Sequence, residues 1–511
     1  ELKVSKGAPP WKAYVEYVND IVTDGLARVV AGSLRFLCDN IDAAEIAKNE
    51  LPPMLADRYL ALKAAGAYGL QVPEEFGGAG LNSTQYGRMS EVLGEHDLGL
   101  GVFLTGHQGI GFKGILICGT EEQKEKYLPR LASGELMAAF SLTEPASGSD
   151  ASSISTRAVL SEDGNTWSLS GSKIWCTGGG LADVFTVFAK TEVRDEKTGE
   201  MKDKITAFIV ERDFGGVTNG PPEKKMGIKC SNTAELYFDN TPVPADNVLG
   251  GVGNGFKVAM QILNNGRFGM GTTLAGTMRM LIQRASTHVT QRTQFGSTLD
   301  TFGGVQEKLA MMSVYQYATE SMAYMVSGTM DSGHDEYQLE AAVSKIFSSE
   351  AAWFVTDEAI QILGGMGYMR DSGLEKVMRD LRIFRIFEGT NDILRLFIAL
   401  TGMQYAGSHL KQLQGAIKLK IALRLDCLRT SGAELLPSIS QPPADRQRVV
   451  QGKSLDHGGR RRRKDDDREA RRTARREGQQ ADAEARAGET RRQAGPDHDT
   501  REQVFVRTGQ G

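Results

Sequence analysis

One carboxylate inside an apolar segment is the first candidate for chemistry in this chain. The segment FRIFEGTNDILRLF, residues 384–397, places Glu388 among Ile, Phe and Leu side chains, directly before Gly389. A carboxylate among apolar groups is costly as an anion, so its pKa should rise and the group should be ready to take a proton. Glu388 is therefore a candidate general base.

Two further motifs have the composition of a binding site for a polar heterocycle. The first, FSLTEPASGSD at residues 140–150, supplies a proline turn, backbone amides and the hydroxyls of Thr143 and Ser149. The second, KIWCTGGG, supplies the flat face of Trp175 and the hydroxyl of Thr177, which points the same way in a strand. Either motif alone is equally well explained as a turn or a core tryptophan. Together with Glu388 they favour a shared site.

A glycine motif at residues 109–114, GIGFKG, matches the pattern G-x-G-x-x-G literally. It follows a helical pattern rather than a strand, so the strand-turn-helix context of a dinucleotide-binding turn is missing. We interpret these glycines as positions of close helix packing.

The elements that must position these motifs follow from the period of the apolar residues, which changes twice. Residues 10–139 have helical spacing and predict an N-terminal helical domain. Residues 140–252 contain short alternating runs bounded by turn residues, which predict an antiparallel sheet, rolled or sandwiched. Residues 253–405 return to long amphipathic helices. The predicted fold class is α+β.

The remaining sequence has a different character. Residues 406–436 form a candidate amphipathic helix, for which packing on the protein's own core is a commoner explanation than a membrane surface. Residues 437–511 carry dense charge of both signs with few apolar side chains, so we predict disorder or a solvated single helix.

Composition excludes several classes of function. The chain has 511 residues and a formal net charge of −4, which gives no general attraction to nucleic acid. Its five cysteines are scattered and never spaced as CxxC, which argues against a disulfide framework and against a zinc site, so no metal is predicted. No run approaches 18 uninterrupted apolar residues, so no single membrane-spanning helix is predicted.

Several separated motifs resemble the acyl-CoA dehydrogenase family, and within it the members specific for very long acyl chains. The resemblance covers about residues 50–405. It rests on the motifs FSLTEPASGSDA, GSKIWCTGGGLADVFTVFAKT, PPEKKMGIKCSNTAE, ILNNGRFGM, RTQFG, QILGGMGYMRD and FRIFEGTNDILR. The resemblance implies an N-terminal helical domain, a middle β-barrel and a C-terminal four-helix domain, with FAD held between them and across a subunit boundary. The disordered tail that we predict from composition is a departure from this pattern.

The resemblance also implies the residues that contact FAD, with the run 361–365 contributed by the neighbouring subunit. These are Phe140, Leu142, Thr143, Ser149, Trp175, Cys176, Thr177, Arg292, Gln361, Ile362, Leu363, Gly364, Gly365, Thr390, Asn391 and Asp392.

By the same resemblance, Glu388 would take the α-proton of a fatty acyl-CoA while the β-hydrogen leaves as hydride to the flavin, giving a trans-2-enoyl-CoA. Electrons would then pass to electron-transfer flavoprotein. Some relatives carry the base at the position of Gly266, which cannot serve here, and Gly106 stands where bulkier residues block the acyl pocket of medium-chain relatives. We therefore expect long-chain substrates. The expected substrate contacts are Ser149, Asn264, Asn265, Gly266, Arg267, Gly389 and Gly106.

The family resemblance implies a homodimer in mitochondria, in the matrix or associated with the inner membrane. Two alternatives from related proteins are an assembly factor for respiratory complex I and an acyl-CoA oxidase. The likeness fades after about residue 420, and we attribute the charged tail to an artefact of gene modelling, such as a shifted reading frame.

Overall fold

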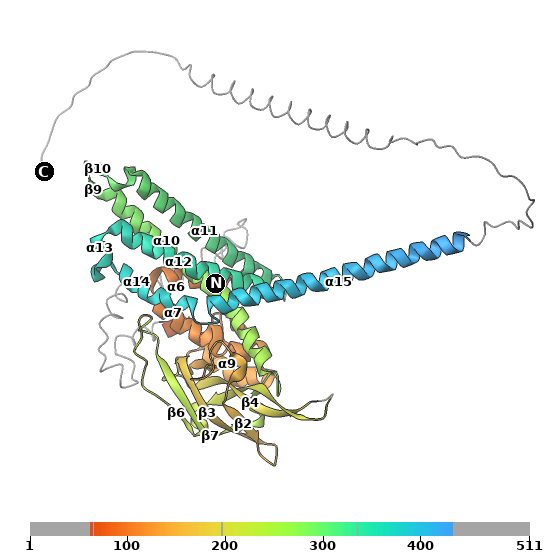
Figure 1. Cartoon of the computed structure of the whole chain (residues 1–511). Helices are drawn as coiled ribbons and strands as arrows, with labels where there is room; N and C mark the ends of the chain where they lie inside the picture. The colour runs from red at the N-terminus through yellow and green to blue at the C-terminus, as the bar shows by residue number, and fades with distance from the viewer. Residues whose placement is uncertain (1–61, 65, 196–197, 335, 433–511) are drawn as a thin grey trace, which may run out of the picture. The chain divides into compact units, whose positions relative to one another are not determined.

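A computed structural model of the chain describes residues 62–64, 66–195, 198–334 and 336–432. Contacts between Cα atoms place the described residues up to Leu419 in one compact unit. The first part of the predicted N-terminal domain, residues 10–61, and the predicted charged tail, residues 437–511, lie outside the described residues. Figure 1 traces the described elements from the N-terminal helices to α15.

The described N-terminal region is a set of short helices, and α6, α7 and α9 among them begin at capping side chains. Asn82 and Gln85 form a capping box at one helix, and Thr120 and Gln123 form another. The Asp97 side chain accepts from the Leu100 N–H at the start of a third. The elements are η2 (Glu74–Phe76), α6 (Ser83–His96), α7 (Leu98–Leu104), the π-helix η3 (Thr105–Gly111), α8 (Lys113–Cys118) and α9 (Glu121–Ala132).

The GIGFKG motif spans the end of η3 and the start of α8. A Cβ added to Gly114 would lie 2.8 Å from Ile262 Cδ1, and one added to Gly111 would lie 2.7 Å from the Ala138 carbonyl oxygen. The prediction of close helix packing is confirmed at Gly114, which meets α10, whereas Gly111 packs against strand β1.

The middle region is a mixed sheet with the strand order β6-β7-β3-β2-β4-β5-β8, in which β1 pairs with β4. Most pairs are antiparallel, but β1 and β2 both run parallel to β4. The expectation of a wholly antiparallel sheet was wrong at these two pairs, because β4 reaches both strands after the chain has crossed through β3. The strands are β1 (Ala138–Ser141), β2 (Arg157–Leu160), β3 (Thr166–Thr177), β4 (Val184–Arg194), β5 (Met201–Glu211), β6 (Val217–Asn219), β7 (Thr233–Pro244) and β8 (Val248–Leu249).

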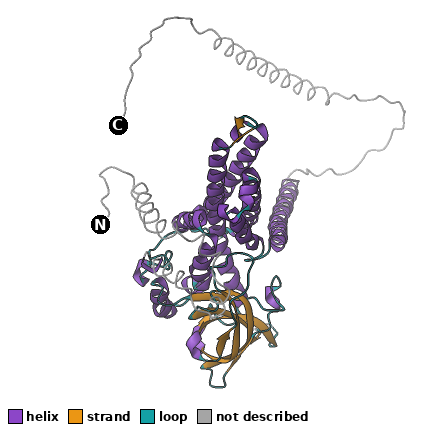
Figure 2. Cartoon of the chain, turned by 90° about the vertical axis from the view of Figure 1, so that its left-hand side faces the viewer, coloured by secondary structure: helices purple, strands orange, loops and turns teal. Residues whose placement is uncertain are grey.

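Two apolar clusters bury the two faces of this sheet. Trp167, Phe185 and Phe208 belong to the inner cluster. Phe188 and Ile209 belong to a second cluster, which also contains α9 and α10 side chains such as Leu128 and Ile262. The sheet is therefore packed against helices on one side (Figure 2).

The C-terminal region is built on long helices, and α10 contacts both α11 and α12 extensively. The hairpin of β9 (Thr293–Gln294) and β10 (Ser297–Thr298) joins α10 to α11. The last helix runs through residues 405 and 406 without interruption, so the helix predicted to begin at 406 is the later part of α15. The helices are α10 (Gly255–Gln291), α11 (Gly303–Asp331), α12 (Gln338–Leu363), α13 (Gly365–Tyr368), α14 (Leu374–Leu381) and α15 (Asn391–Gly432). Within the described ranges, no helix combines the length and apolar character needed to cross a bilayer.

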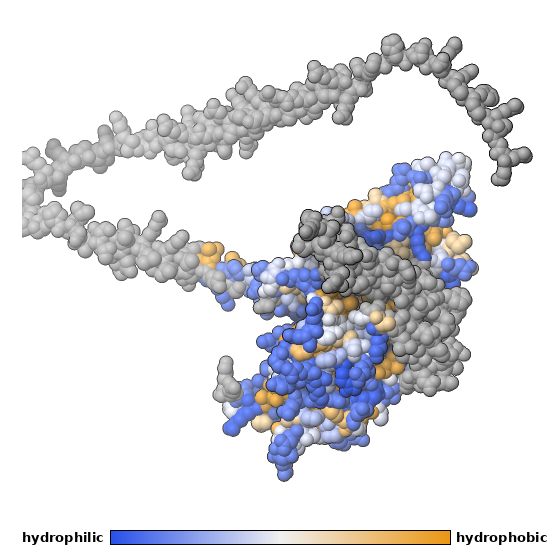
Figure 3. Space-filling view, turned by 180° about the vertical axis from the view of Figure 1, so that it is seen from behind, coloured by the Kyte–Doolittle hydropathy of each residue, from blue (hydrophilic) through white to orange (hydrophobic). Residues whose placement is uncertain are grey.

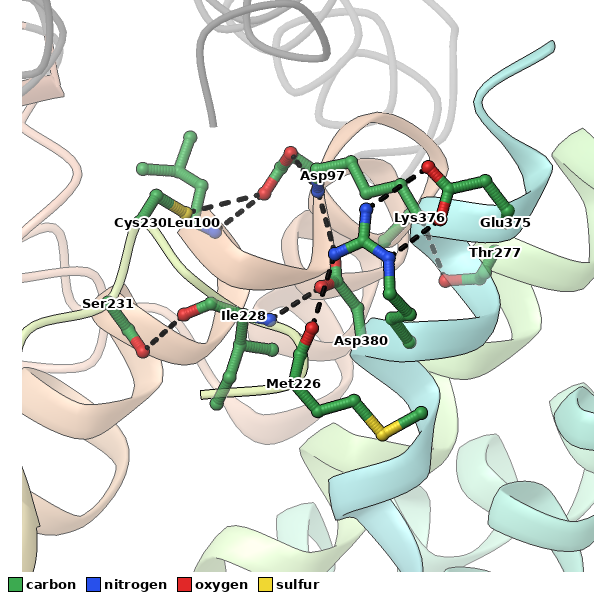
Figure 4. Close-up of polar contacts among 12 residues, drawn as sticks. Asp97, Leu100, Met226, Ile228, Cys230, Ser231, Thr277, Glu375, Lys376 and Asp380 are labelled. Carbon is green, nitrogen blue, oxygen red and sulfur yellow. Dashed lines mark hydrogen bonds and ion pairs between the residues drawn. The ribbon is translucent and has the colours of Figure 1, made fainter. Parts of the chain in front are cut away.

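A buried charged cluster joins the three regions (Figure 4). Lys376 Nζ of α14 lies 2.9 Å from Asp97 Oδ2 and 2.6 Å from Asp380 Oδ2. The Asp380 carboxylate also accepts from the backbone N–H of Ile228, in the loop between β6 and β7. The side chains of Asp97, Lys376 and Asp380 are at most 7% exposed. One amino group therefore connects α7 and α14, and through Asp380 the middle-region loop.

Candidate active site

Glu388 lies in a left-handed turn between the short helix η9 (Arg382–Arg385) and α15. Its φ is 55°, and that of Gly389 is 90°. A non-glycine residue with positive φ is uncommon, and such strain is a feature of functional sites. The turn directs the carboxylate towards α10, where an added Cβ on Gly266 would lie 3.4 Å from Glu388 Oε2.

The Glu388 carboxylate is in an apolar, partly charged environment. Its Oε2 is buried and has no hydrogen-bond partner. Burial raises the pKa of Glu388 to about 6, and the nearby positive charges of Arg267 and Lys345 oppose that rise. The predicted upward shift is confirmed. At neutral pH the group is therefore an ionised but poorly solvated proton acceptor.

The backbone of this turn is held by two cations from different helices. Arg267 of α10 donates from Nε and Nη2 to the Glu388 carbonyl, at 3.2 and 3.1 Å. Lys345 of α12 donates to the Gly389 carbonyl at 2.9 Å and to Asn391 Oδ1 at 2.8 Å. Lys345 was not predicted from the sequence, although a lysine inside the apolar run AAVSKIFSSEAAWF is a recognisable signal of a buried amino group.

The motifs FSLTEPASGSD and KIWCTGGG lie side by side. The Ile174 N–H donates to the Thr143 carbonyl at 2.9 Å, and Lys173 Nζ donates to the Leu142 carbonyl at 3.1 Å. Lys173 also forms a buried ion pair with Glu144, at 2.7 Å. The strand that carries Trp175 is thereby bound to the loop that carries Thr143. Neither member of the ion pair was singled out from the sequence.

Trp175 and its neighbour Cys176 face opposite ways. Trp175 is 63% exposed at φ 56°, where the pairing of β3 with β7 shifts register. Cys176 is buried in the sheet core, where burial raises the pKa of its thiol to about 11. Trp175 thus offers a free aromatic face, and only the backbone of Cys176 is available to a ligand.

The π-helix η3 connects these motifs to Glu388. At one end, an added Cβ on Gly106 would lie 2.7 Å from Thr177 Cγ2. At the other end, Ile110 Cγ2 and the Gly109 carbonyl oxygen lie 3.5 and 3.6 Å from the Cβ position of Gly266, beside the Glu388 carboxylate. Thr177 and Glu388 are therefore placed at the two ends of one seven-residue helix.

Gly106 has a packing reason in this arrangement. A side chain at position 106 would collide with Thr177, so glycine permits the close approach of η3 to the end of β3. From the sequence, Gly106 was predicted to lie at the floor of an acyl pocket and to leave room there for a long acyl tail. The packing of η3 against β3 is a different explanation for a glycine at this position.

Other predicted residues lie around the turn or support it. Asn264 accepts from Arg267 Nη1 at 2.6 Å, and Asn265 donates to the Tyr337 hydroxyl at 3.3 Å. Asn391 donates to Ser349 Oγ at 2.9 Å, and Thr390 Oγ1 accepts from the Ile393 N–H at the start of α15. In the first motif, Leu142 is buried, Phe140 is half-buried against Phe188 and Ser149 is exposed.

A second group of predicted residues is not brought to Glu388 within one chain. Arg292 caps the far end of α10, about 39 Å along the helix from Gly266 at 1.5 Å per residue. Residues 361–365 lie at the end of α12, where Ile362 and Leu363 pack in the helical core and Gln361, Gly364 and Gly365 are exposed. Asp392 does not belong to this group, because it lies in the first turn of α15, close to Glu388 in the chain, where it is exposed.

The residues near η3 fit a planar polar ring system such as a flavin. The exposed face of Trp175, the Thr177 side chain and the loop after β1 lie together, which suits stacking on one side and polar contact at the edge. Among the residues that the structure describes, no group of three or more His, Cys, Asp or Glu side chains is arranged to hold a metal ion.

Removing the Lys173 amino group is expected to loosen this site. In Lys173→Met, Glu144 keeps its hydrogen bonds from the Ser155 and Thr156 N–H groups but loses its cation, and the Leu142 carbonyl loses its donor. We expect FAD retention to fall by about tenfold, since a charged hydrogen bond contributes about 1.5–3 kcal/mol. Flavin absorbance per protein after dialysis measures this. Lys190→Met, a change of a half-buried lysine on β4, is the control, and equal flavin content in the two variants would refute the expectation.

Models of the three domains of acyl-CoA dehydrogenases match this chain. The N-terminal domain model matches residues 28–135, the middle domain model residues 139–241 and the C-terminal domain model residues 253–402. Two solved structures are similar in fold. Butyryl-CoA dehydrogenase from Megasphaera elsdenii is 33% identical with a TM-score of 0.68, and the match covers 78% of this chain and 100% of that one. An acyl-CoA dehydrogenase from Bacillus anthracis, complexed with FAD, is 34% identical with a TM-score of 0.68. The match covers 80% of this chain and 70% of that one.

Curated relatives agree with these matches. The mitochondrial very long-chain specific acyl-CoA dehydrogenases of Bos taurus and Homo sapiens are each 61% identical over 406 residues, which are 79% of this chain. The match spans 62% of the length of those relatives. An acyl-CoA dehydrogenase of Bacillus subtilis is 40% identical over 334 residues, which are 65% of this chain and 86% of that protein.

Proposed function

The chain belongs to the acyl-CoA dehydrogenase family, and from this premise we propose that it oxidises long-chain fatty acyl-CoA to trans-2-enoyl-CoA, with FAD as cofactor. The observation that carries the proposal is the buried Oε2 of Glu388, which has no hydrogen-bond partner and faces Gly266. A carboxylate in this state is suited to take a proton from a weak carbon acid. Bound FAD supplies the acceptor for the β-hydrogen, which leaves with its electron pair.

In this proposal each neighbour of Glu388 has a distinct task. Gly266 keeps the space beside the carboxylate open, because any side chain there would approach Oε2. Arg267 holds the Glu388 carbonyl, which fixes the direction of the side chain. Ser149, Asn264, Asn265 and Gly389 are proposed to contact the acyl-CoA.

The residues around Trp175 are proposed to hold the isoalloxazine. Trp175 would stack on it, while Thr143, Ser149, Thr177 and the Cys176 backbone would contact its edge. Phe140 and Leu142 shape the pocket from the first motif. Arg292 and residues 361–365 are proposed to hold the pyrophosphate and adenine of the partner subunit's FAD, and residues 390–392 to complete the flavin site.

Anaerobic titration with acyl-CoAs of graded length tests the function. The purified protein should be yellow, and palmitoyl-CoA should bleach the flavin at least about tenfold faster than octanoyl-CoA, because each buried methylene of the longer tail adds up to about 0.8 kcal/mol of binding. Faster bleaching by octanoyl-CoA would contradict the chain-length proposal, and no bleaching by any acyl-CoA would contradict the activity.

Electron-transfer flavoprotein is the proposed electron acceptor, and a homodimer in mitochondria, with peripheral inner-membrane association, is the proposed assembly. Exposed apolar side chains favour a second subunit on the helical end. They include Phe295, which is 96% exposed in the β9–β10 hairpin, and Val314, Tyr317 and Met325 of α11. Apolar patches are visible among the polar surface of this end in Figure 3.

A mixture of the protein, palmitoyl-CoA and electron-transfer flavoprotein should reduce the acceptor. Rapid peroxide formation in air, which is the behaviour of an acyl-CoA oxidase, would contradict this choice of acceptor. Sedimentation should give a dimer.

A further inference from the structure

Lys345 is a buried lysine whose amino group contacts the same turn as the proposed base. Its side chain is 0% exposed, in the middle of α12. Both of its hydrogen bonds go to the segment after Glu388, namely to the Gly389 carbonyl and to Asn391 Oδ1. Burial lowers the pKa of Lys345 to about 8, so keeping this amino group charged is costly.

The two positive-φ residues of the turn are held separately. Arg267 binds the Glu388 carbonyl from α10, and Lys345 binds the Gly389 carbonyl from α12. Asn391 extends the second anchor, because its Nδ2 donates to Ser349 Oγ on α12. Without Lys345, the Gly389 carbonyl and Asn391 Oδ1 both lose their charged donor, and a left-handed glutamate has less to hold it in place.

We propose that Lys345 is a positioning residue for Glu388. Lys345 holds the turn so that the Glu388 carboxylate faces Gly266, and the charge of Lys345 sets the pH range in which that carboxylate is ionised. The catalytic role of Glu388 in this inference rests on the proposed function. The contacts between Lys345 and the turn involve only residues of this chain.

The groups that face Glu388 come from three helices. Arg267 of α10 and Lys345 of α12 favour the carboxylate, and Tyr86 of α6 interacts with it electrostatically. Burial raises the pKa of Tyr86, so it stays neutral. Arg267 is positive at every relevant pH. Lys345 is therefore the group whose replacement changes the charge near Glu388 without removing the anchor on its own carbonyl.

The test compares Lys345→Met, Lys345→Gln and Lys345→Arg with Lys113→Met. Lys113 is the matched control, because it is also a buried lysine and donates to Gln71 Oε1, away from the turn. The first readout is the pKa of the Glu388 carboxyl, which is measured by ¹³C NMR in protein labelled at glutamate. The Glu388 signal is assigned by its absence in Glu388→Gln. This readout does not require turnover.

We expect Lys345→Met and Lys345→Gln to raise the pKa of Glu388 from about 6 to about 7, since loss of one charge several ångströms away is worth about 1.4 kcal/mol in a partly buried site. Lys345→Arg and Lys113→Met should leave it unchanged. The second readout is the pH dependence of flavin bleaching by palmitoyl-CoA. The acid limb of the rate should move by the same amount, so that the rate of Lys345→Met at pH 6 falls about fivefold further than its rate at pH 9.

Lys345→Gln separates the charge from the hydrogen bond. It keeps a donor to the Gly389 carbonyl, so its bleaching rate at pH 9 should stay near that of the unaltered protein, whereas that of Lys345→Met should fall. If Lys345→Met does not fold, Lys345→Gln provides both readouts.

An unchanged pKa of Glu388 in a folded Lys345→Gln or Lys345→Met protein would overturn the proposal and leave Lys345 a structural residue. Absence of bleaching in the unaltered protein would instead refute the proposed function, and the NMR titration would still decide the role of Lys345.

Discussion

Glu388→Gln is expected to slow the bleaching of bound flavin by palmitoyl-CoA by about 10²–10⁴-fold while the protein stays yellow, which is the loss typical of removing a general base. The amide has the same size as the carboxylate but cannot take a proton. Gly266, the position that carries the base in some relatives, offers no substitute. Stopped-flow absorbance under anaerobic conditions measures the rate, and flavin content measures the retained colour.

The same variant should change how stability depends on pH. In the folded protein the pKa of Glu388 is raised from 4.5 to about 6, so between these values the folded state binds more protons than the unfolded state. The carboxylate therefore makes the protein less stable as the pH rises through this window. Relative to Glu388→Gln, the unaltered protein should lose about 1 kcal/mol between pH 5 and pH 8, measured by thermal or urea unfolding.

Glu340→Gln is the matched control for both measurements, because it removes an exposed carboxylate at the start of α12. It should bleach at the normal rate and show no such pH dependence. A Glu388→Gln protein that bleaches within tenfold of the unaltered rate would exclude Glu388 as the base.

Lys376→Met is expected to destabilise the protein by about 3–5 kcal/mol, which is the effect of removing one partner from a buried charge cluster. The substitution leaves Asp97 and Asp380 without their shared cation, and both carboxylates are nearly inaccessible to water. Because Asp97 starts α7 and Asp380 binds the Ile228 N–H, the damage should extend to all three regions of the fold (Figure 4). Urea unfolding followed by circular dichroism measures the loss.

The surface ion pair of the half-buried Lys124 and the exposed Glu121 provides the control. Lys124→Met should cost less than about 1 kcal/mol, because exposed ion pairs contribute little. Combining Lys376→Met with Asp97→Asn and Asp380→Asn should recover part of the lost stability, since neutral amides are cheaper to bury than unpaired carboxylates. A loss below about 1 kcal/mol for Lys376→Met alone would show that the cluster does not join the regions.

The sequence was sufficient for properties that depend on neighbouring residues. The apolar run around Glu388 predicted a raised pKa, and burial is the main cause of the rise in the structure. The periods of the apolar residues predicted the order of helices, strands and helices. The missing strand context of GIGFKG excluded a dinucleotide turn, and the structure has the expected close packing there.

Only the tertiary structure decided which distant groups meet. Lys376 and Asp97 are 279 positions apart, and Arg267 and Glu388 are 121 apart, so no local pattern links them. The parallel pairing of β1 and β2 with β4 and the inward direction of Cys176 likewise depend on how the sheet is assembled. Periodicity reports that a side chain is buried, but its partner is set by the packing of elements from different parts of the chain, which is why Lys345 and Lys376 were found only in the folded molecule.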